Sequence, residues 1–178
     1  MVCSKFVRVG TPPNVSSLAG VSGMDVRRFY AELFAPLEHT IGRLDQDTLV
    51  AIVGFDAGGP LNFRSSGRGE GRFTTYVSCE LAVRSEQQPA EFGRYELLTT
   101  SDDEEWVMSV VTRIGRMSLE TAFDEGHTLD IVAWVEPTDI IQGVIFEQLF
   151  GTEIDGEGYG VLRVIGVTRP EMDFARAH

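Results

Sequence analysis

The sequence predicts an α+β domain: a mixed, mainly antiparallel sheet packed by two or three helices. The expected order is helix, two or three strands, helix, three strands, helix, without the regular strand–helix alternation of a doubly wound sheet. Residues 73–84 alternate apolar and polar side chains, which is typical of an antiparallel strand with one buried face. Residues 102–117 form an amphipathic helix pattern whose apolar stripe would pack on such a sheet.

The beginning of the chain divides into an expected arm and an expected domain. Residues 1–23 have no sustained hydrophobic period and are expected to form a loose N-terminal arm, followed by a single domain over residues 24–178. A first helix is expected from Met24, because apolar side chains recur at helical spacing at Val26, Phe29, Tyr30 and Leu33. Pro36 is expected to end this helix near Phe34.

Strands dominate the region that follows. Residues 48–55 predict a well-buried strand, and the glycine-rich residues 56–72 predict a loop. Residues 73–84 predict the clearest strand, and residues 95–100 predict another. The apolar face of the 73–84 strand is expected to hold Phe73, Val77, Cys79, Leu81 and Val83.

Two capping patterns mark the later helices. Ser101 and Glu104 have the spacing of a capping box, and so do Thr168 and Glu171, which would open a short final helix. The apolar stripe of the first of these helices comprises Trp106, Val107, Val110, Val111 and Ile114. Between the two helices, strands are expected over residues 128–135, 143–150 and 161–167.

Charge and composition limit the classes of partner. The 178 residues carry a net charge of −12, which disfavours nucleic acid and favours a basic protein or peptide; the alternative is that the acidity only maintains solubility. No apolar run approaches the ~20 residues of a membrane span, and the N-terminus lacks the apolar stretch of a secretory signal. With only two cysteines, a reducing, cytoplasmic location is expected.

No motif in the sequence predicts a cofactor, a metal site or catalysis. The glycines of SGRGEGR lie between strands, so they lack the following helix N-terminus that a phosphate loop needs. His127 and Asp130 would point to opposite faces of a strand, which disfavours a shared metal, and His127 is expected to hydrogen-bond a turn. Cys79 is expected to be a buried, inert thiol. Trp134 shares the face of Asp130 and is expected to be half exposed and available to a partner.

The second half of the chain resembles the suppressor-of-fused family. The resemblance is carried by RYELLTTSDDEEW (94–106), EGHTLDIVAWVEP (125–137), IQGVIFEQLF (141–150) and YGVLRVIGVTRPEMDFAR (159–176), together with the earlier strand FTTYVSCEL (73–81). It implies a mixed α+β domain without known catalytic residues that binds a peptide by strand addition, here as a single-domain, bacterial-type member. It also places Tyr76 and Glu96 near that peptide. The family's Gly-x-Ser-Asp turn is replaced by Glu80, Ala82 and Val83, and its second lobe is absent.

These observations together predict a non-catalytic protein-binding domain, either an immunity protein or a small intracellular regulator. The expected partner is a basic protein or peptide, with no cofactor, no metal, no nucleic acid and no membrane. The candidate partner-binding residues are Tyr76, Glu96, Asp130 and Trp134. The alternative that remains open is an enzyme or a small-molecule sensor with a site near His127 and Glu96.

Overall fold

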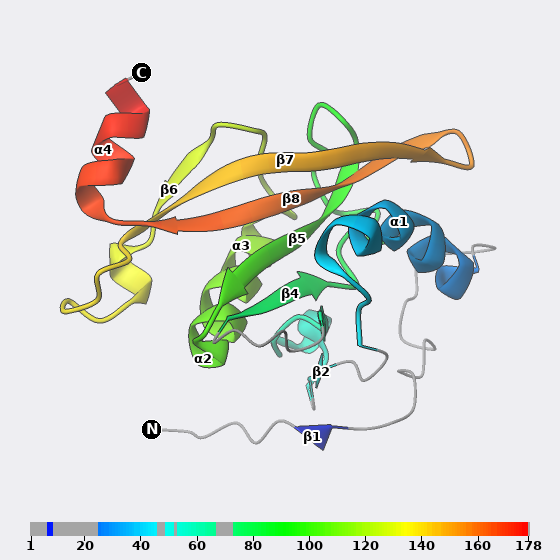
Figure 1. The fold of residues 1–178 in the computed structure, drawn as a ribbon, viewed down its shortest axis with the longest axis horizontal. Helices are drawn as coiled ribbons and strands as arrows, with labels where there is room; N and C mark the ends of the chain where they lie inside the picture. Colours follow the sequence, from blue (N-terminus) through cyan, green and yellow to red (C-terminus); the bar gives the residue numbers. More distant parts are fainter. Residues whose placement is uncertain (1–6, 9–24, 46–48, 52, 67–72, 178) are drawn as a thin grey trace.

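The computed structural model describes residues 7–8, 25–45, 49–51, 53–66 and 73–177. Their strands are Val7–Arg8 (β1), Leu49–Val50 (β2), Phe63–Ser65 (β3), Thr74–Ser78 (β4), Arg94–Ser101 (β5), Thr128–Asp130 (β6), Gly143–Ile154 (β7) and Glu157–Val167 (β8). They form one eight-stranded sheet in the order β1-β2-β3-β4-β5-β8-β7-β6 (Figure 1). Only β5 and β8 pair in parallel, so the predicted mixed, mainly antiparallel α+β class is confirmed.

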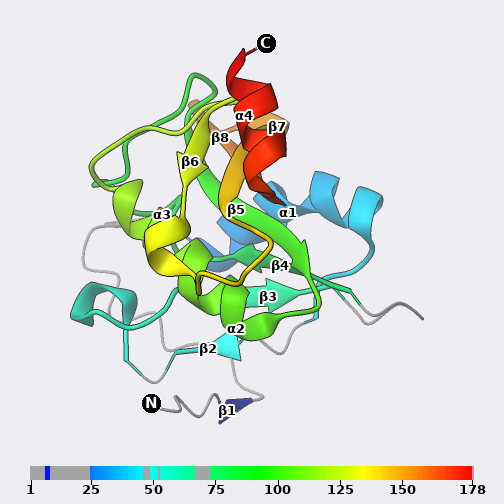
Figure 2. The same cartoon turned by 90° about the vertical axis from the view of Figure 1, so that its left-hand side faces the viewer.

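Helices cover both faces of this sheet. They are Val26–Ile41 (α1), Glu104–Trp106 (α2), the π-helical turn Val107–Val111 (η3), Thr112–Met117 (α3) and Arg169–Ala177 (α4), with 3-10 turns at Phe55–Ala57 (η2) and Val132–Trp134 (η4). Figure 2 shows α1 on one side of the central strands and α3 on the other. The sheet is therefore the middle layer of three around its centre.

Two apolar cores separate these layers. On one face α1 buries Phe29, Leu33 and Leu37 in a cluster that includes Val77, Leu98 and Val161 of the central strands. On the other face η3 and α3 bury Val107, Val110 and Ile114 with Tyr76, Leu97 and Leu162. Because successive side chains of a strand point to opposite faces, the central strands must be apolar on both.

The prediction of one buried face for residues 73–84 is wrong. Both Tyr76 and Val77 are buried, and the strand ends at Ser78, after which the chain turns. The polar Ser78 is buried because its hydroxyl donates to Glu96 and accepts from the amide of Leu97. Phe73, assigned to the apolar face, is instead 60% exposed.

Pro36 does not end the first helix, contrary to the prediction. Asp25 caps the helix through the amides of Arg27 and Arg28, and the helix then runs through Pro36 to Ile41. An internal proline costs a helix about 3 kcal/mol. The burial of Leu37, the residue directly after Pro36, offsets part of that cost.

Other element predictions are corrected in their extent. The expected strand over residues 48–55 is a strand only at Leu49–Val50, with Phe55 in η2, and the expected loop over 56–72 contains β3. The expected strand over 128–135 ends at Asp130, whose carboxylate accepts from the amide of Val132 and opens η4. The expected arm lies outside the described residues, apart from Val7–Arg8, which pairs with β2.

The two predicted helix caps have different outcomes. The central helix is capped by Asp103, whose carboxylate accepts from the amide of Trp106 at 2.9 Å, and not by the expected box of Ser101 and Glu104. The final helix has one half of its expected box: the Glu171 carboxylate accepts from the amide of Thr168 at 2.8 Å, while the Thr168 hydroxyl donates to the same carboxylate.

Candidate functional site

The parallel strands β5 and β8 part at their C-terminal ends. Their pairing runs from Arg94 with Tyr159 to Leu98 with Arg163, and no register partner follows. Beyond that point one side-chain hydrogen bond, from the Thr99 hydroxyl to the carbonyl of Val164 at 2.8 Å, still joins the two strands. The sheet is thus split on the side where residues 99–101 and 164–167 continue.

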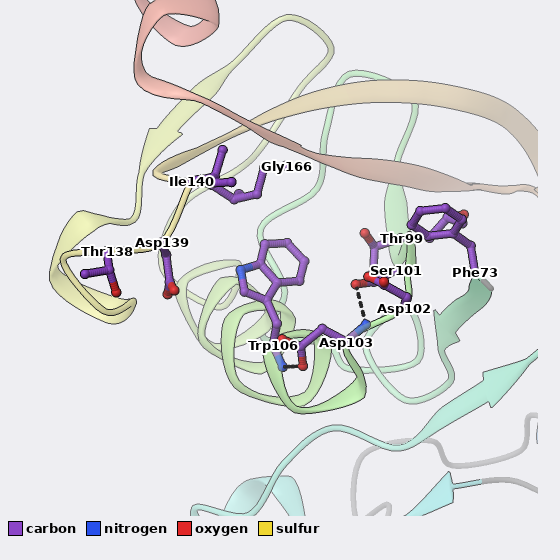
Figure 3. A pocket seen from close by; sticks show the side chains of 12 residues that line it. Phe73, Thr99, Ser101, Asp102, Asp103, Trp106, Thr138, Asp139, Ile140 and Gly166 are labelled. Carbon is purple, nitrogen blue, oxygen red and sulfur yellow. Dashed lines mark hydrogen bonds between the residues drawn. The ribbon is translucent and has the colours of Figure 1, made fainter.

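A cleft of about 580 Å³ lies at this split (Figure 3). Its walls are the end of β5, the first residues of the central helix, the loop over residues 138–141 and Gly166 of β8. Phe73, just before β4, completes it. The volume is within the roughly 300–1,000 Å³ that is common for ligand sites.

Apolar side chains form the floor and the rim of the cleft. Trp106 stands in its middle, and Phe73 and Ile140 lie on opposite sides of the indole (Figure 3). Phe73 is 60% and Ile140 77% exposed, and they are two of the five large apolar side chains exposed among the described residues. The indole Nε1 is buried and has no hydrogen-bond partner in the described part of the chain. Exposed apolar side chains at one concave place indicate a contact surface.

Three aspartates add negative charge to the cleft. Asp103 caps the helix at Trp106, and the Asp139 carboxylate accepts from the amide of Glu136 at 2.8 Å, so both side chains are held in place. Asp102 lines the cleft beside them, and no basic side chain does among the residues that the structure describes. Because a carboxylate has more acceptor sites than one backbone amide occupies, Asp103 and Asp139 can still bind a cation. The cleft is therefore complementary to an apolar ligand that carries positive charge.

The first two predicted partner-binding residues are buried on opposite faces of the sheet. Tyr76 packs in the core under η3 and α3. Glu96 is fully buried on the α1 side, where it accepts from the Tyr30 hydroxyl at 2.7 Å, from the Ala82 amide at 2.9 Å and from the Ser78 hydroxyl. Burial raises the pKa of Glu96, and these hydrogen bonds oppose the rise. Neither side chain is on the surface of this structure.

The other two predicted residues lie near the surface, one in the edge strand β6 and one in the turn η4 that follows it. Asp130 accepts from the amide of Val132 and pairs with Arg169 at 2.7 Å; both interactions lower the pKa of Asp130, the backbone bond more strongly. Trp134 is half-buried, with the guanidinium of Arg113 5.8 Å from its ring centre. Both lie in the segment that leads into the cleft loop.

The alternative site near His127 and Glu96 is not assembled in the structure. His127 is exposed and its Nδ1 accepts from the amide of Asp124 at 3.2 Å, the turn contact expected from the sequence. Glu96 is buried elsewhere with other partners. Burial also raises the pKa of the Cys79 thiol. The described residues contain no cluster of three or more metal-ligating side chains, and none of their helices is long and apolar enough to cross a membrane.

The sequence patterns did not predict the cleft. Phe73 was assigned to a core face, Ile140 received no role, and Gly166 was only one residue of an expected strand. The one local signal was the apolar pair Ile140 and Ile141, which follows directly after the polar Thr138 and Asp139. The parting of two strands has no sequence pattern of its own.

Comparison with solved structures identifies the fold. A chain of the Sufu–Fu complex crystal structure matches with a TM-score of 0.60 and 14% identity, over 84% of this chain and 78% of that chain. The crystal structure of Drosophila Suppressor of Fused matches with a TM-score of 0.56 and 14% identity, over 80% of this chain and 42% of that chain. No protein-family model and no curated protein matches the sequence. The resemblance drawn from the sequence is confirmed at the level of the fold, which is suppressor-of-fused-like.

Proposed function

We propose that this chain, which has a suppressor-of-fused-like fold, is a non-catalytic protein-binding domain that holds a basic protein or peptide at the β5–β8 cleft. The observation that carries the proposal is the lining of the cleft, where two exposed apolar side chains and three aspartates meet and none of the described lining residues is basic. One structural neighbour was crystallised in a Sufu–Fu complex, so a protein of this fold takes part in protein binding.

The net charge supports a basic partner. A chain with a charge of −12 attracts positively charged proteins over distance and speeds their association. In the cytoplasm this would suit an immunity protein that neutralises a basic toxin, in a bacterial relative of suppressor of fused. It would equally suit a small regulator that sequesters a basic segment.

The predicted contact residues take different parts in this proposal. Asp130 and Trp134 lie in the segment that leads into the cleft loop, and we assign them flanking contacts with a bound protein. Tyr76 and Glu96 are buried, so we assign them the support of β4 and β5 rather than direct contact. Their replacement should then weaken binding only by disturbing those strands.

The test uses the partner that the chain captures in its native host, purified and titrated against the purified chain by calorimetry. Ile140→Asn and Phe73→Asn should each raise Kd about tenfold or more, which corresponds to ~1.4 kcal/mol. Val53→Asn is the matched control, since Val53 is 50% exposed but does not line the cleft, and it should leave Kd within about twofold. An equal Kd for all three variants would mean that the partner binds to another surface of the chain.

A further inference from the structure

We infer that the cleft binds one arginine side chain of the partner, stacked on the indole of Trp106 and ion-paired with Asp139. This inference rests on the proposed function and names the chemical group by which the partner is recognised. The residues next to that arginine would be apolar and would contact Phe73 and Ile140. Recognition by a side chain in this way is compatible with any backbone conformation of the partner.

The indole of Trp106 is fixed in the wall of the cleft. The Trp106 amide donates to the Asp103 carboxylate at 2.9 Å, and the side chain packs against the buried cluster that contains Val107 and Val110. The far end of the ring reaches β8, where a Cβ added to Gly166 would lie 3.7 Å from Cη2 of the indole. Trp106 is nevertheless only partly buried, and it lines the cleft. A large aromatic ring held in this way is a surface on which a cation or a planar group can stack.

The carboxylate of Asp139 is held beside this ring by a tight turn. Its Oδ2 accepts from the amide of Glu136 at 2.8 Å, and the amide of Asp139 donates to the carbonyl of Glu136 at 2.9 Å. Its Oδ1 has no hydrogen-bond partner and no ion pair among the described residues. Figure 3 shows the Asp139 carboxylate on the same side of the indole as Ile140. Because Asp139 is partly buried, an ion pair there is screened less by solvent than one on an open surface.

A flat ring and a fixed carboxylate together favour a guanidinium. The guanidinium of arginine is planar, stacks on aromatic faces and donates two parallel hydrogen bonds to one carboxylate, whereas the lysine ammonium is compact and strongly hydrated. The other tryptophan of the chain already has such a neighbour, since the guanidinium of Arg113 lies 5.8 Å from the ring centre of Trp134. None of the cation–ring contacts among the described residues involves Trp106. The partner would therefore supply the cation at Trp106.

The two ends of the cleft define the neighbours of the arginine. The cleft volume of about 580 Å³ is larger than one arginine side chain, and Phe73 and Ile140 lie on opposite sides of the indole. They are 60% and 77% exposed, so a bound partner can cover them with apolar side chains on either side of the arginine. This burial adds affinity that a single ion pair near the surface does not supply. The recognised group is thus an arginine flanked by apolar residues.

The experiment uses three acetylated tripeptide amides that carry arginine, citrulline or lysine between two leucines. Citrulline has nearly the shape of arginine but no charge, and lysine has the charge without the planar group. Each peptide is titrated into the whole chain, and NMR follows the indole N–H of Trp106 and the methyl groups of Ile140. The arginine peptide should bind at least about fivefold more tightly than the citrulline peptide and about threefold more tightly than the lysine peptide.

Matched variants test the ion pair without disturbing the turn. Asp139→Asn keeps a side-chain oxygen for the amide of Glu136 but removes the charge, so it should weaken binding of the arginine peptide at least about fivefold. Thermal melting of the free variant checks that the fold is intact. Asp124→Asn is the control, because Asp124 also accepts from a backbone amide, that of Glu91 at 2.7 Å, but does not line the cleft. It should leave the affinity of all three peptides within about twofold.

The outcomes separate this inference from the proposed function. Equal affinities of the arginine and citrulline peptides, or an equal effect of Asp139→Asn and Asp124→Asn, would overturn the arginine site. A lysine peptide that binds as tightly as the arginine peptide would overturn the stacked guanidinium. No binding of the arginine peptide at ~10 mM would overturn the site as well. In each case the protein-binding role is judged separately, by the response of the captured native partner to Ile140→Asn and Phe73→Asn.

Discussion

The buried carboxylate of Glu96 joins three parts of the chain that are far apart in sequence. It accepts from Tyr30 of α1, Ser78 of β4 and the amide of Ala82 in the following turn. Truncation in Glu96→Ala would leave these three donors buried without an acceptor. Each such group costs about 1–3 kcal/mol, so the variant should lose a large part of a stability of ~5–15 kcal/mol. Urea unfolding measures this loss, and an unchanged midpoint would contradict the role of Glu96.

The same carboxylate predicts a pH dependence of stability. Burial raises the pKa of Glu96 above its ordinary value of 4.5, so its contribution is full below pH 4.5 and is lost as pH rises through the folded-state pKa. Glu96→Gln cannot ionise, and its free energy of unfolding should fall less than that of the wild type between pH 5 and 8. The burial-raised pKa of Glu80 acts in both proteins, so the slope should shrink without vanishing. Urea unfolding at each pH measures both free energies. An equal fall in the wild type and in Glu96→Gln would contradict this assignment to Glu96.

The thiol of Cys79 offers a chemical test of burial. Its pKa is raised by desolvation first and by the carboxylate of Glu96 second, so little thiolate forms at neutral pH. In a Cys3→Ser background, iodoacetamide should label Cys79 at least about tenfold more slowly in the native chain than in 6 M urea. Mass spectrometry follows the labelling. Equal rates would show an accessible, reactive thiol and favour the enzyme alternative.

At the scale of elements, the π-helical turn η3 carries the main contact of the central helix with the sheet. Val110 is buried in that contact, and Ser109 beside it is exposed. Val110→Asp should cost several kcal/mol by burying an unpaired charge, whereas Ser109→Asp should change the free energy of unfolding by no more than about 0.5 kcal/mol. Thermal melting of the two variants compares them directly. Similar melting temperatures would mean that the helix packs by another face.

Elements were predictable from sequence where local chemistry determines them. The β7–β8 hairpin was predicted only as a break between strands over residues 143–150 and 161–167. Both strands instead continue to Asp155 and Gly156, whose φ of 50° and 83° form the tight turn that an Asp-Gly pair favours. The N-cap of the central helix was harder to predict, because Ser101, Asp102 and Asp103 are all good capping residues. Burial of Ser78 was unpredictable, since its partners Glu96 and Leu97 come from another strand.

At the scale of the whole molecule, the α+β class and the suppressor-of-fused-like fold were predictable, and the cleft was not. The class follows from the order of the elements, which the chain carries in its hydrophobic pattern. The cleft depends on where β5 stops pairing with β8, and those strands are over sixty residues apart. It also needs the long-range meeting of Phe73, Trp106 and Ile140, which no local spacing reveals.

The net charge of the molecule predicts how fast a basic partner arrives. Long-range attraction should make the association rate with the native partner fall clearly between low salt and ~0.15 M, where the Debye length is about 8 Å. Stopped-flow tryptophan fluorescence would follow the association, because Trp106 stands in the cleft.

Matched charge variants distinguish electrostatic attraction by the aspartates of the cleft from attraction by the net charge of the whole chain. One variant replaces Asp102 and Asp139 by Asn; the control replaces Glu153 and Asp155 at the far tip of the β7–β8 hairpin by Gln and Asn (Figure 1). Both remove two negative charges. If the aspartates of the cleft attract the partner, the cleft variant should slow association and reduce its salt dependence more than the hairpin variant does. Only the cleft variant should also change the dissociation rate. Equal effects would mean that net charge alone attracts the partner, and a rate independent of salt would remove the electrostatic basis for a basic one.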